Sequence, residues 1–127
     1  MKMFTRIVLS FILLFSACIV FAGEVPYTQK SLDELRANGK PVVVHFHATW
    51  CPTCKKQAEI VNSLLAEKQF KDLTVLRADV DTEKALMKNM NVAERSTFVV
   101  FKGRSEVARS TGDTNQNSIA TLFQKAL

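Results

Sequence analysis

The feature that most constrains this chain is the order of three segments: a strand, a helix and a second strand. Residues 42–48 begin with three consecutive valines, as expected for a strand that is buried on both faces. A helix is predicted to begin at or just after Cys51, because Pro52 suits the first turn of a helix. Residues 73–80 are predicted to form a second strand. This order of strand, helix and strand predicts a βαβ unit, in which the two strands are parallel and their connection is right-handed.

Further segments extend this unit at both ends. A helix is predicted to start at Ser31, which can cap it, with Glu34 three residues on, and to stop at Asn38-Gly39. The segments after the unit are a short helix at 82–89, a strand at 97–101, a returning strand at 106–110 and a last helix after Gly112. The expected fold class is α/β, with a central mixed β-sheet flanked by helices.

The first 22 residues differ in composition from the rest. Lys2 and Arg6 precede an uncharged run from Ile7 to Phe21, and Ala22 follows it. This pattern is typical of a secretory signal peptide that is cleaved after Ala22, which leaves residues 23–127 as one domain. The expected location is therefore periplasmic or otherwise extracytoplasmic.

Two other interpretations of this leader remain open. Phe15-Ser16-Ala17-Cys18 resembles a lipoprotein signal, which would make Cys18 a lipidated residue. The uncharged run would instead be a retained membrane anchor if it were not cleaved, although it is short for a bilayer span.

Charge and composition exclude several classes of protein. The 127 residues are 47% hydrophobic and 23% charged, a globular balance with room for one domain. Loss of Lys2 and Arg6 with the leader lowers the net charge from +5 to +3. This charge is too small, and too evenly spread, to predict nucleic-acid binding.

The segment Trp50-Cys51-Pro52-Thr53-Cys54 carries the chemistry. Cys51 falls at a helix N-terminus, where unpaired N–H groups favour a thiolate, and Cys54 lies one turn further on. The positions predicted to face the core from this helix are Cys54, Ala58, Val61 and Leu65. The pattern predicts that Cys51 is an exposed nucleophile and Cys54 a buried resolving thiol, and that the two form a reversible disulfide. A zinc site would need further ligands, and no second cysteine pair is present.

These segments resemble the thioredoxin family. Val42–Lys55 is similar to the family's active-site strand, turn and helix, Arg77–Asp81 to its next strand, and Thr97–Gly103 with Gly112 to its closing hairpin. Ser31–Pro41 is most similar to secreted thioredoxin-like domains of periplasmic thiol relays. The resemblance implies a thioredoxin fold, Cys51 as nucleophile, Cys54 as resolving thiol, and a shallow peptide-binding groove. The residues expected in this groove are Trp50, Pro52, Thr53, Arg95, Ser96 and Gly112.

The sequence departs from the family at the loop that faces the cysteines. Ser96 stands where the family has a cis-proline, and the prolines of the predicted domain are Pro26, Pro41 and Pro52. We therefore expect the Arg95–Ser96 peptide bond to be trans or a strained cis bond.

A second departure concerns two histidines. His45 occupies the position of the family's buried acid, so it is a candidate proton acceptor for Cys54; the other interpretation is a buried neutral histidine with one hydrogen bond. His47 lies two residues further along the strand and shares a face with His45. Together with Cys51 and Cys54, the two histidines form a candidate Zn or Cu site.

The sequence thus predicts an extracytoplasmic protein-disulfide oxidoreductase, in the reducing direction. A disulfide-donating oxidase is one alternative, since Pro52 directly after the first cysteine resembles the more oxidising relatives, and a metal-binding module is another. No cofactor is expected, because the chain shows no nucleotide-binding or flavin motif. The expected partners are protein thiols and disulfides and a membrane-bound electron donor or acceptor, and the expected state is a monomer.

Overall fold

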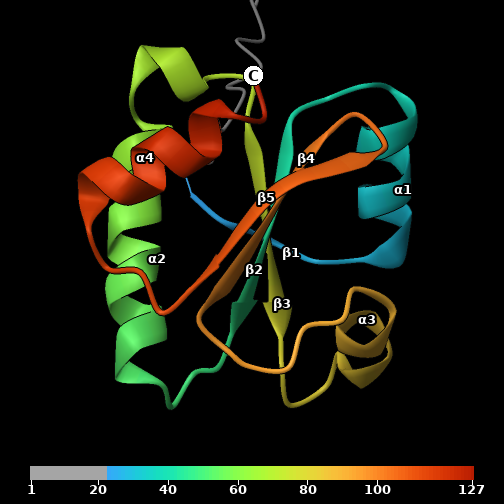
Figure 1. Cartoon of the computed structure of the whole chain (residues 1–127), viewed down its shortest axis with the longest axis vertical. Helices are drawn as coiled ribbons and strands as arrows, with labels where there is room; N and C mark the ends of the chain where they lie inside the picture. The colour runs from blue at the N-terminus through green and yellow to red at the C-terminus, as the bar shows by residue number, and fades with distance from the viewer. Residues whose placement is uncertain (1–22) are drawn as a thin grey trace, which may run out of the picture.

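The computed structural model describes residues 23–127, so the predictions for the leader, Cys18 included, lie outside the described residues. Five strands and four α-helices make up this part of the chain, and they alternate except that β5 follows β4 directly (Figure 1). The strands are β1 Val25–Pro26, β2 Val42–His47, β3 Thr74–Asp79, β4 Thr97–Lys102 and β5 Ser105–Thr111. The helices are α1 Gln29–Ala37, α2 Pro52–Leu65, α3 Lys84–Asn89 and α4 Gln116–Gln124, with a 3-10 turn at Lys68–Phe70.

The strands form one mixed sheet in the order β1-β3-β2-β4-β5. β1, β3 and β2 are parallel, whereas β4 pairs antiparallel with β2 and β5 antiparallel with β4. The predicted α/β class and mixed sheet are confirmed. β2 lies at the centre with all six residues buried, as its run of valines predicts.

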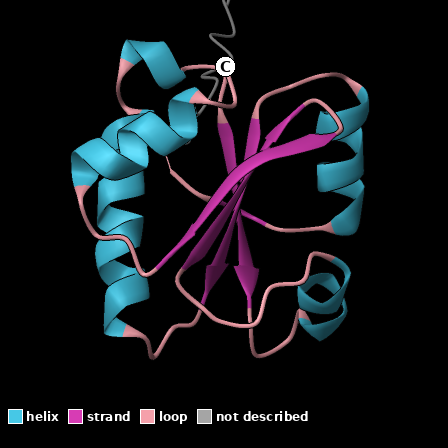
Figure 2. Cartoon of the chain, in the orientation of Figure 1, coloured by secondary structure: helices cyan, strands magenta, loops and turns pink. Residues whose placement is uncertain are grey.

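Helices cover both faces of the sheet (Figure 2). Val42, Val44 and Phe46 of β2 belong to a core cluster that includes Leu32 of α1 and Leu86 of α3. Val43 belongs to a second cluster, which α2 and α4 complete from the other side with Val61, Leu64, Ile119 and Phe123. Alternate residues of one strand thus supply both cores, because successive side chains point to opposite faces.

Two local predictions need correction. The N-cap of α1 is Thr28, whose side chain accepts a hydrogen bond from the Ser31 amide, so the helix begins two residues before Ser31. On α2, Leu65 was predicted to face the core, but it is only half-buried. Leu64 is buried instead, because it lies three residues after the buried Val61 and so on the same face of the helix. The lead-in before α1 contains a further two-residue strand, β1.

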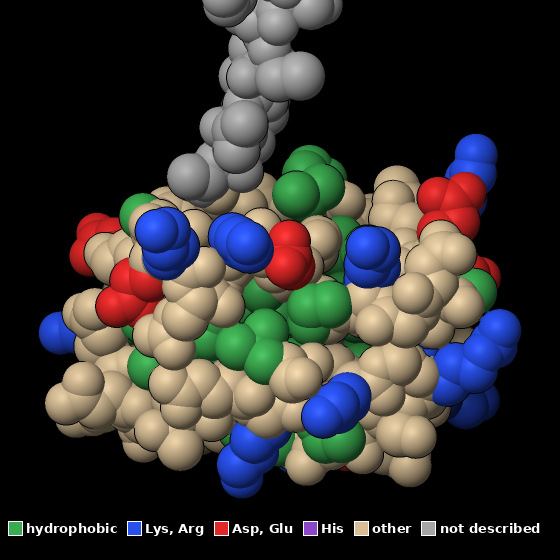
Figure 3. All heavy atoms as spheres, turned by 90° about the horizontal axis from the view of Figure 1, so that it is seen from above, with side chains coloured by type: hydrophobic (Ala, Val, Ile, Leu, Met, Phe, Trp, Pro, Cys, Tyr) green, Lys and Arg blue, Asp and Glu red, His purple; other side chains and the backbone are tan. Residues whose placement is uncertain are grey.

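The two ends of the sheet differ. The N-terminus of α2, which carries the cysteine pair, lies at one end (Figure 1). The opposite end shows separate Lys and Arg side chains around a few apolar ones (Figure 3). Within residues 23–127, no helix is both long and apolar enough to span a bilayer.

Candidate redox site

Cys51 and Cys54 meet where β2 delivers the chain to α2. Cys51 is the N-cap residue of α2, in extended conformation, and Pro52 opens the helix. The Cys54 backbone amide donates to Cys51 Sγ at 3.2 Å, which satisfies one of the free N–H groups of the first turn. The Cys54 thiol also donates to Cys51 Sγ, at 2.6 Å. Both cysteines are free thiols in this structure.

The two thiols have opposite pKa shifts. Burial alone would raise the pKa of Cys51, but hydrogen bonds from the Cys54 thiol, the Ser96 hydroxyl and the Cys54 amide, together with the nearby Arg95 side chain, lower it to about 7. Burial raises the pKa of Cys54, and donation to Cys51 raises it further. A thiolate is therefore favoured on Cys51, as a nucleophile at a helix N-terminus requires.

The predicted difference in exposure between the two sulfurs is not found. Cys51 is 2% exposed and Cys54 is fully buried. The reason is the loop before β4: Ser96 lies over the pair, with its hydroxyl oxygen 3.3 Å from Cys51 Sγ and 3.2 Å from Cys54 Sγ.

Ser96 has an unusual backbone. Its φ is +60°, in the left-handed region, and no peptide bond among residues 23–127 is cis. The Arg95–Ser96 peptide bond is therefore trans, which is one of the two states expected from the sequence. A left-handed conformation costs a serine about 1–2 kcal/mol, so the surroundings must enforce it.

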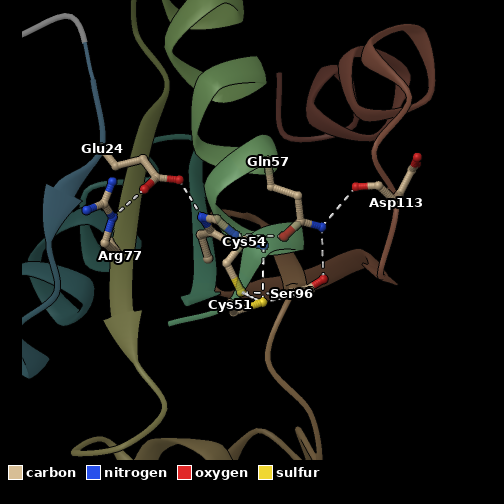
Figure 4. A network of polar contacts seen from close by, with 8 residues as sticks. Glu24, Cys51, Cys54, Gln57, Arg77, Ser96 and Asp113 are labelled. Carbon is tan, nitrogen blue, oxygen red and sulfur yellow. Dashed lines mark hydrogen bonds and ion pairs between the residues drawn. The ribbon is translucent and has the colours of Figure 1, made fainter. Parts of the chain in front are cut away.

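His45 does not contact the cysteines through a hydrogen bond. Its Nε2 lies 2.9 Å from Gln57 Oε1, and its Nδ1 pairs with the carboxylate of Glu24 (Figure 4). The geometry therefore does not support His45 as a direct proton acceptor for Cys54. It also differs from the alternative of a single hydrogen bond, because both ring nitrogens have partners.

Glu24 supplies a buried acid from an unexpected place. Its side chain is fully buried between His45 and Arg77, whose Nε donates to Oε2 at 2.6 Å. Burial would raise the pKa of Glu24, but the hydrogen bonds and charges of His45 and Arg77 outweigh it and hold the pKa below 4.5. The buried carboxylate beside His45 thus comes from the N-terminal lead-in and not from the central strand.

Of the two network residues that were not predicted, Gln57 and Glu24, only Gln57 has a signal in the sequence. Gln57 is a fully buried amide on the stripe that Cys54, Ala58 and Val61 form on α2, and a polar residue there requires buried partners. Glu24 has no such signal, since it lies beside a two-residue strand with no periodic pattern.

The candidate metal site is not supported either. His45 and His47 do share a face, with ring centroids 5.5 Å apart. However, both nitrogens of His45 are already bonded, and residues 23–127 contain no group of three His, Cys, Asp or Glu residues placed to hold a metal ion. Burial and the charge of Arg77 lower the pKa of His47.

A hollow of about 520 Å³ adjoins the cysteines. Five of the six expected groove residues line it, namely Trp50, Thr53, Arg95, Ser96 and Gly112, while exposed Pro52 does not. Trp50 is 56% exposed, its Nε1 donates to Asp81 at 2.9 Å, and the Arg95 guanidinium stacks 4.7 Å from its ring centroid. The groove thus presents the aromatic ring of Trp50, which the carboxylate of Asp81 and the guanidinium of Arg95 hold in place.

Comparison with known proteins agrees with this geometry. The thioredoxin family model matches residues 25–125. Thioredoxin of Mycobacterium bovis is 40% identical over 80 residues, which cover 63% of this chain and 67% of that protein. Thioredoxin of Mycolicibacterium smegmatis is 32% identical over 109 residues, covering 84% and 96%. The crystal structure of Trxlp from Edwardsiella tarda is similar with a TM-score of 0.75 and 33% identity, covering 77% of this chain and 95% of that one.

Proposed function

This chain belongs to the thioredoxin family and is a thiol–disulfide oxidoreductase, and from that premise we propose that it reduces protein disulfides outside the cytoplasm. Cys51 is the nucleophile and Cys54 the resolving thiol. Proteins of this family act on protein thiols or disulfides, and the groove beside Trp50 is the proposed docking site.

The proposed reaction has two exchanges. The Cys51 thiolate attacks one sulfur of the substrate disulfide, forms a mixed disulfide and expels the other substrate sulfur as a thiolate. Cys54 then loses its proton and attacks Cys51 Sγ, which lies 2.6 Å away. The Cys51–Cys54 disulfide forms, the bond from Cys51 to the substrate breaks, and both substrate sulfurs end as thiols.

The reducing direction rests on the set of hydrogen bonds around Cys51 Sγ, from the Cys54 thiol, the Cys54 amide and Ser96, which lower the pKa of Cys51 only to about 7. In reducing relatives the nucleophilic thiol has a pKa of about 7, whereas in strong disulfide donors it is about 3.5. A more stable thiolate favours the reduced enzyme and makes the protein an oxidant. Pro52 directly after Cys51 favours the opposite direction, so oxidation is the second candidate.

A glutathione redox titration decides between these directions. The purified protein is equilibrated with glutathione buffers, and the state of Cys51 and Cys54 is determined by thiol alkylation and mass spectrometry. A potential near about −270 mV supports the reductase, and one near about −120 mV supports the disulfide donor. Absence of any reversible couple would contradict both.

The extracytoplasmic location rests on the leader pattern of residues 1–22. Cell fractionation, with mass analysis of the isolated chain, tests it. A chain that begins at Gly23 in the periplasm supports the proposal, whereas a lipid on Cys18 or an intact leader in the membrane supports the alternatives. A cytoplasmic chain that retains residues 1–22 would overturn it.

A reductase outside the cytoplasm needs electrons from a partner. Since the sequence shows no nucleotide-binding or flavin motif, we propose a membrane-bound thiol donor that reduces the Cys51–Cys54 disulfide. Crosslinking a Cys54→Ala variant in cells, followed by identification of the disulfide-linked membrane protein, tests this partner. Recovery of soluble adducts alone would contradict it.

A further inference from the structure

The hydroxyl of Ser96 is the one side-chain group, apart from the cysteines themselves, that lies within hydrogen-bond distance of both sulfurs among residues 23–127. Its oxygen is 3.3 Å from Cys51 Sγ and 3.2 Å from Cys54 Sγ. The residue is 6% exposed, so little water competes for these contacts. A serine hydroxyl carries one hydrogen and two lone pairs, so it can donate to one sulfur while it accepts from the other.

The backbone of Ser96 is fixed in the conformation that aims this hydroxyl at the sulfurs. Its N–H donates to the Phe46 carbonyl at 2.8 Å, and its carbonyl accepts from the Gly112 amide at 2.9 Å. The Ser96 carbonyl also accepts from Gln57 Nε2 at 3.0 Å. Three hydrogen bonds therefore hold a residue that would otherwise leave the left-handed region.

Gln57 is in turn fixed by its own partners. Its Nε2 donates both hydrogens to carbonyls, of Ser96 and of Asp113 at 2.9 Å, so its Oε1 must face His45. His45 is held from the other side by Glu24. A row of buried polar groups thus runs from Glu24 to the carbonyl of Ser96 (Figure 4).

We propose that Ser96 is a catalytic residue, which stabilises the Cys51 thiolate and carries the proton of Cys54 during product release. The proposal rests on the proposed function, because it concerns the second of its two exchanges. Cys54 needs such a group, since no carboxylate or imidazole among the described residues hydrogen bonds to its sulfur.

The proton transfer balances within the site. In the mixed disulfide, the Cys54 thiol gives its proton to Ser96 Oγ, and the Ser96 hydroxyl gives its own proton to the departing substrate sulfur. The substrate sulfur is bonded directly to Cys51 Sγ, and Cys51 Sγ lies 3.3 Å from the Ser96 hydroxyl oxygen. The Cys54 thiolate forms the bond to Cys51 as the Cys51–substrate bond breaks, and Ser96 ends unchanged.

Two variants separate the hydroxyl from the backbone. Ser96→Ala removes the hydroxyl and keeps the strain of a positive φ, whereas Ser96→Gly removes the hydroxyl and relieves that strain. Ser105→Ala, at the exposed start of β5, is the matched control. The Gly variant is expected to fold at least as well as the unchanged protein, so loss of structure does not obscure the result.

The test uses the reduced protein and oxidised glutathione as the probe. Rapid acid quenching and mass spectrometry follow the glutathione adduct on Cys51. In both Ser96 variants we expect release of the adduct to slow by about 100-fold, so that the adduct accumulates, as expected for loss of a proton-transfer group. We also expect the alkylation midpoint of Cys51 to move to higher pH. Ser105→Ala should match the unchanged protein in both measurements.

The proposal is overturned if neither Ser96 variant accumulates the adduct, or if Ser96→Gly releases it at the normal rate while Ser96→Ala does not. The second result would assign Ser96 a role in backbone shape only. Failure of the proposed function looks different: the unchanged protein itself would then show no reversible Cys51–Cys54 couple in the glutathione titration.

Discussion

The carboxylate of Glu24 accepts a hydrogen bond from Nδ1 of His45, which joins the start of the described chain to the central strand 21 residues later. Both side chains are fully buried. Arg77, on the neighbouring strand and in register with His45, holds the second carboxylate oxygen. The short lead-in before α1 is therefore part of the polar network beneath the redox site.

We predict that Glu24→Ala lowers the free energy of unfolding by about 3–5 kcal/mol, because it leaves His45 without its buried partner. Glu24→Gln should cost less, since an amide still offers a hydrogen bond to His45. Urea denaturation at pH 7 measures both. Glu59→Ala, on the exposed face of α2, is the control and should change stability by less than about 0.5 kcal/mol. Equal effects of Glu24→Ala and Glu59→Ala would contradict the network.

The contribution of Glu24 to the free energy of unfolding should depend on pH in the acid range. Its pKa in the folded protein lies below the ordinary value of 4.5, so the unfolded chain binds the proton more readily. The stabilisation is therefore complete above about pH 4.5 and is lost as the pH falls through the folded pKa. The stability difference between the unchanged protein and Glu24→Gln, measured by denaturation from pH 7 to pH 2, should shrink below pH 4.5. A stability difference that grows in acid would show that folding raises the pKa of Glu24 and does not lower it.

Alkylation of Cys51 by iodoacetamide should follow a single titration with a midpoint of about 7. The thiolate fraction rises with pH through this midpoint, while Cys54 stays protonated because its pKa is raised. In Cys54→Ala the midpoint should move to higher pH, since Cys51 loses the thiol that donates to it. Mass spectrometry identifies the alkylated residue. Preferential alkylation of Cys54 would reverse the assigned roles.

Cys54→Ser should trap the mixed disulfide between Cys51 and a protein substrate, because the resolving thiolate is absent. Non-reducing electrophoresis should show a covalent complex that disappears on addition of dithiothreitol. Cys51→Ser is the matched control and should form no such complex. A stable complex with Cys51→Ser instead would make Cys54 the nucleophile.

Arg95→Ala should raise KM for protein disulfides about 2- to 5-fold, because it removes the cation stacked on Trp50. The Arg95 side chain also lowers the pKa of Cys51, so the alkylation midpoint should rise slightly in the variant. Steady-state reduction of insulin measures KM. Arg104→Ala, an exposed arginine in the turn between β4 and β5, is the control. If both variants give the same KM, the groove beside Trp50 does not bind the substrate.

Several features of this protein follow from local sequence patterns. Three of them depend only on neighbours within about two helical turns. They are the valine run of residues 42–44, the placement of Cys51 at a helix N-terminus, and the placement of Cys54 on the side of the helix that faces the core. The structure confirms all three, with β2 at the centre of the sheet and Cys51 as the N-cap of α2. The element boundaries differ by one or two residues, because competing caps such as Thr28 and Ser31 lie close together in the chain.

The site residues that sequence patterns missed make contacts across long separations. Gln57 bonds to the carbonyls of Ser96 and Asp113, 39 and 56 residues away, and Glu24 lies 21 residues from its partner His45. His45 was expected to act on Cys54 directly, but its two nitrogens face Glu24 and Gln57. No periodic pattern encodes such pairs, since the partners belong to separate elements.

The sequence by itself determined the α/β architecture and the identity of the cysteine pair, because helix caps and hydrophobic periods act over short distances. Only the tertiary structure decided which groups surround the sulfurs. Packing of the lead-in, α2 and the loop before β4 against β2 brings Glu24, Gln57 and Ser96 to one buried site. There each polar group must find a partner, because an unpaired one would cost free energy away from water.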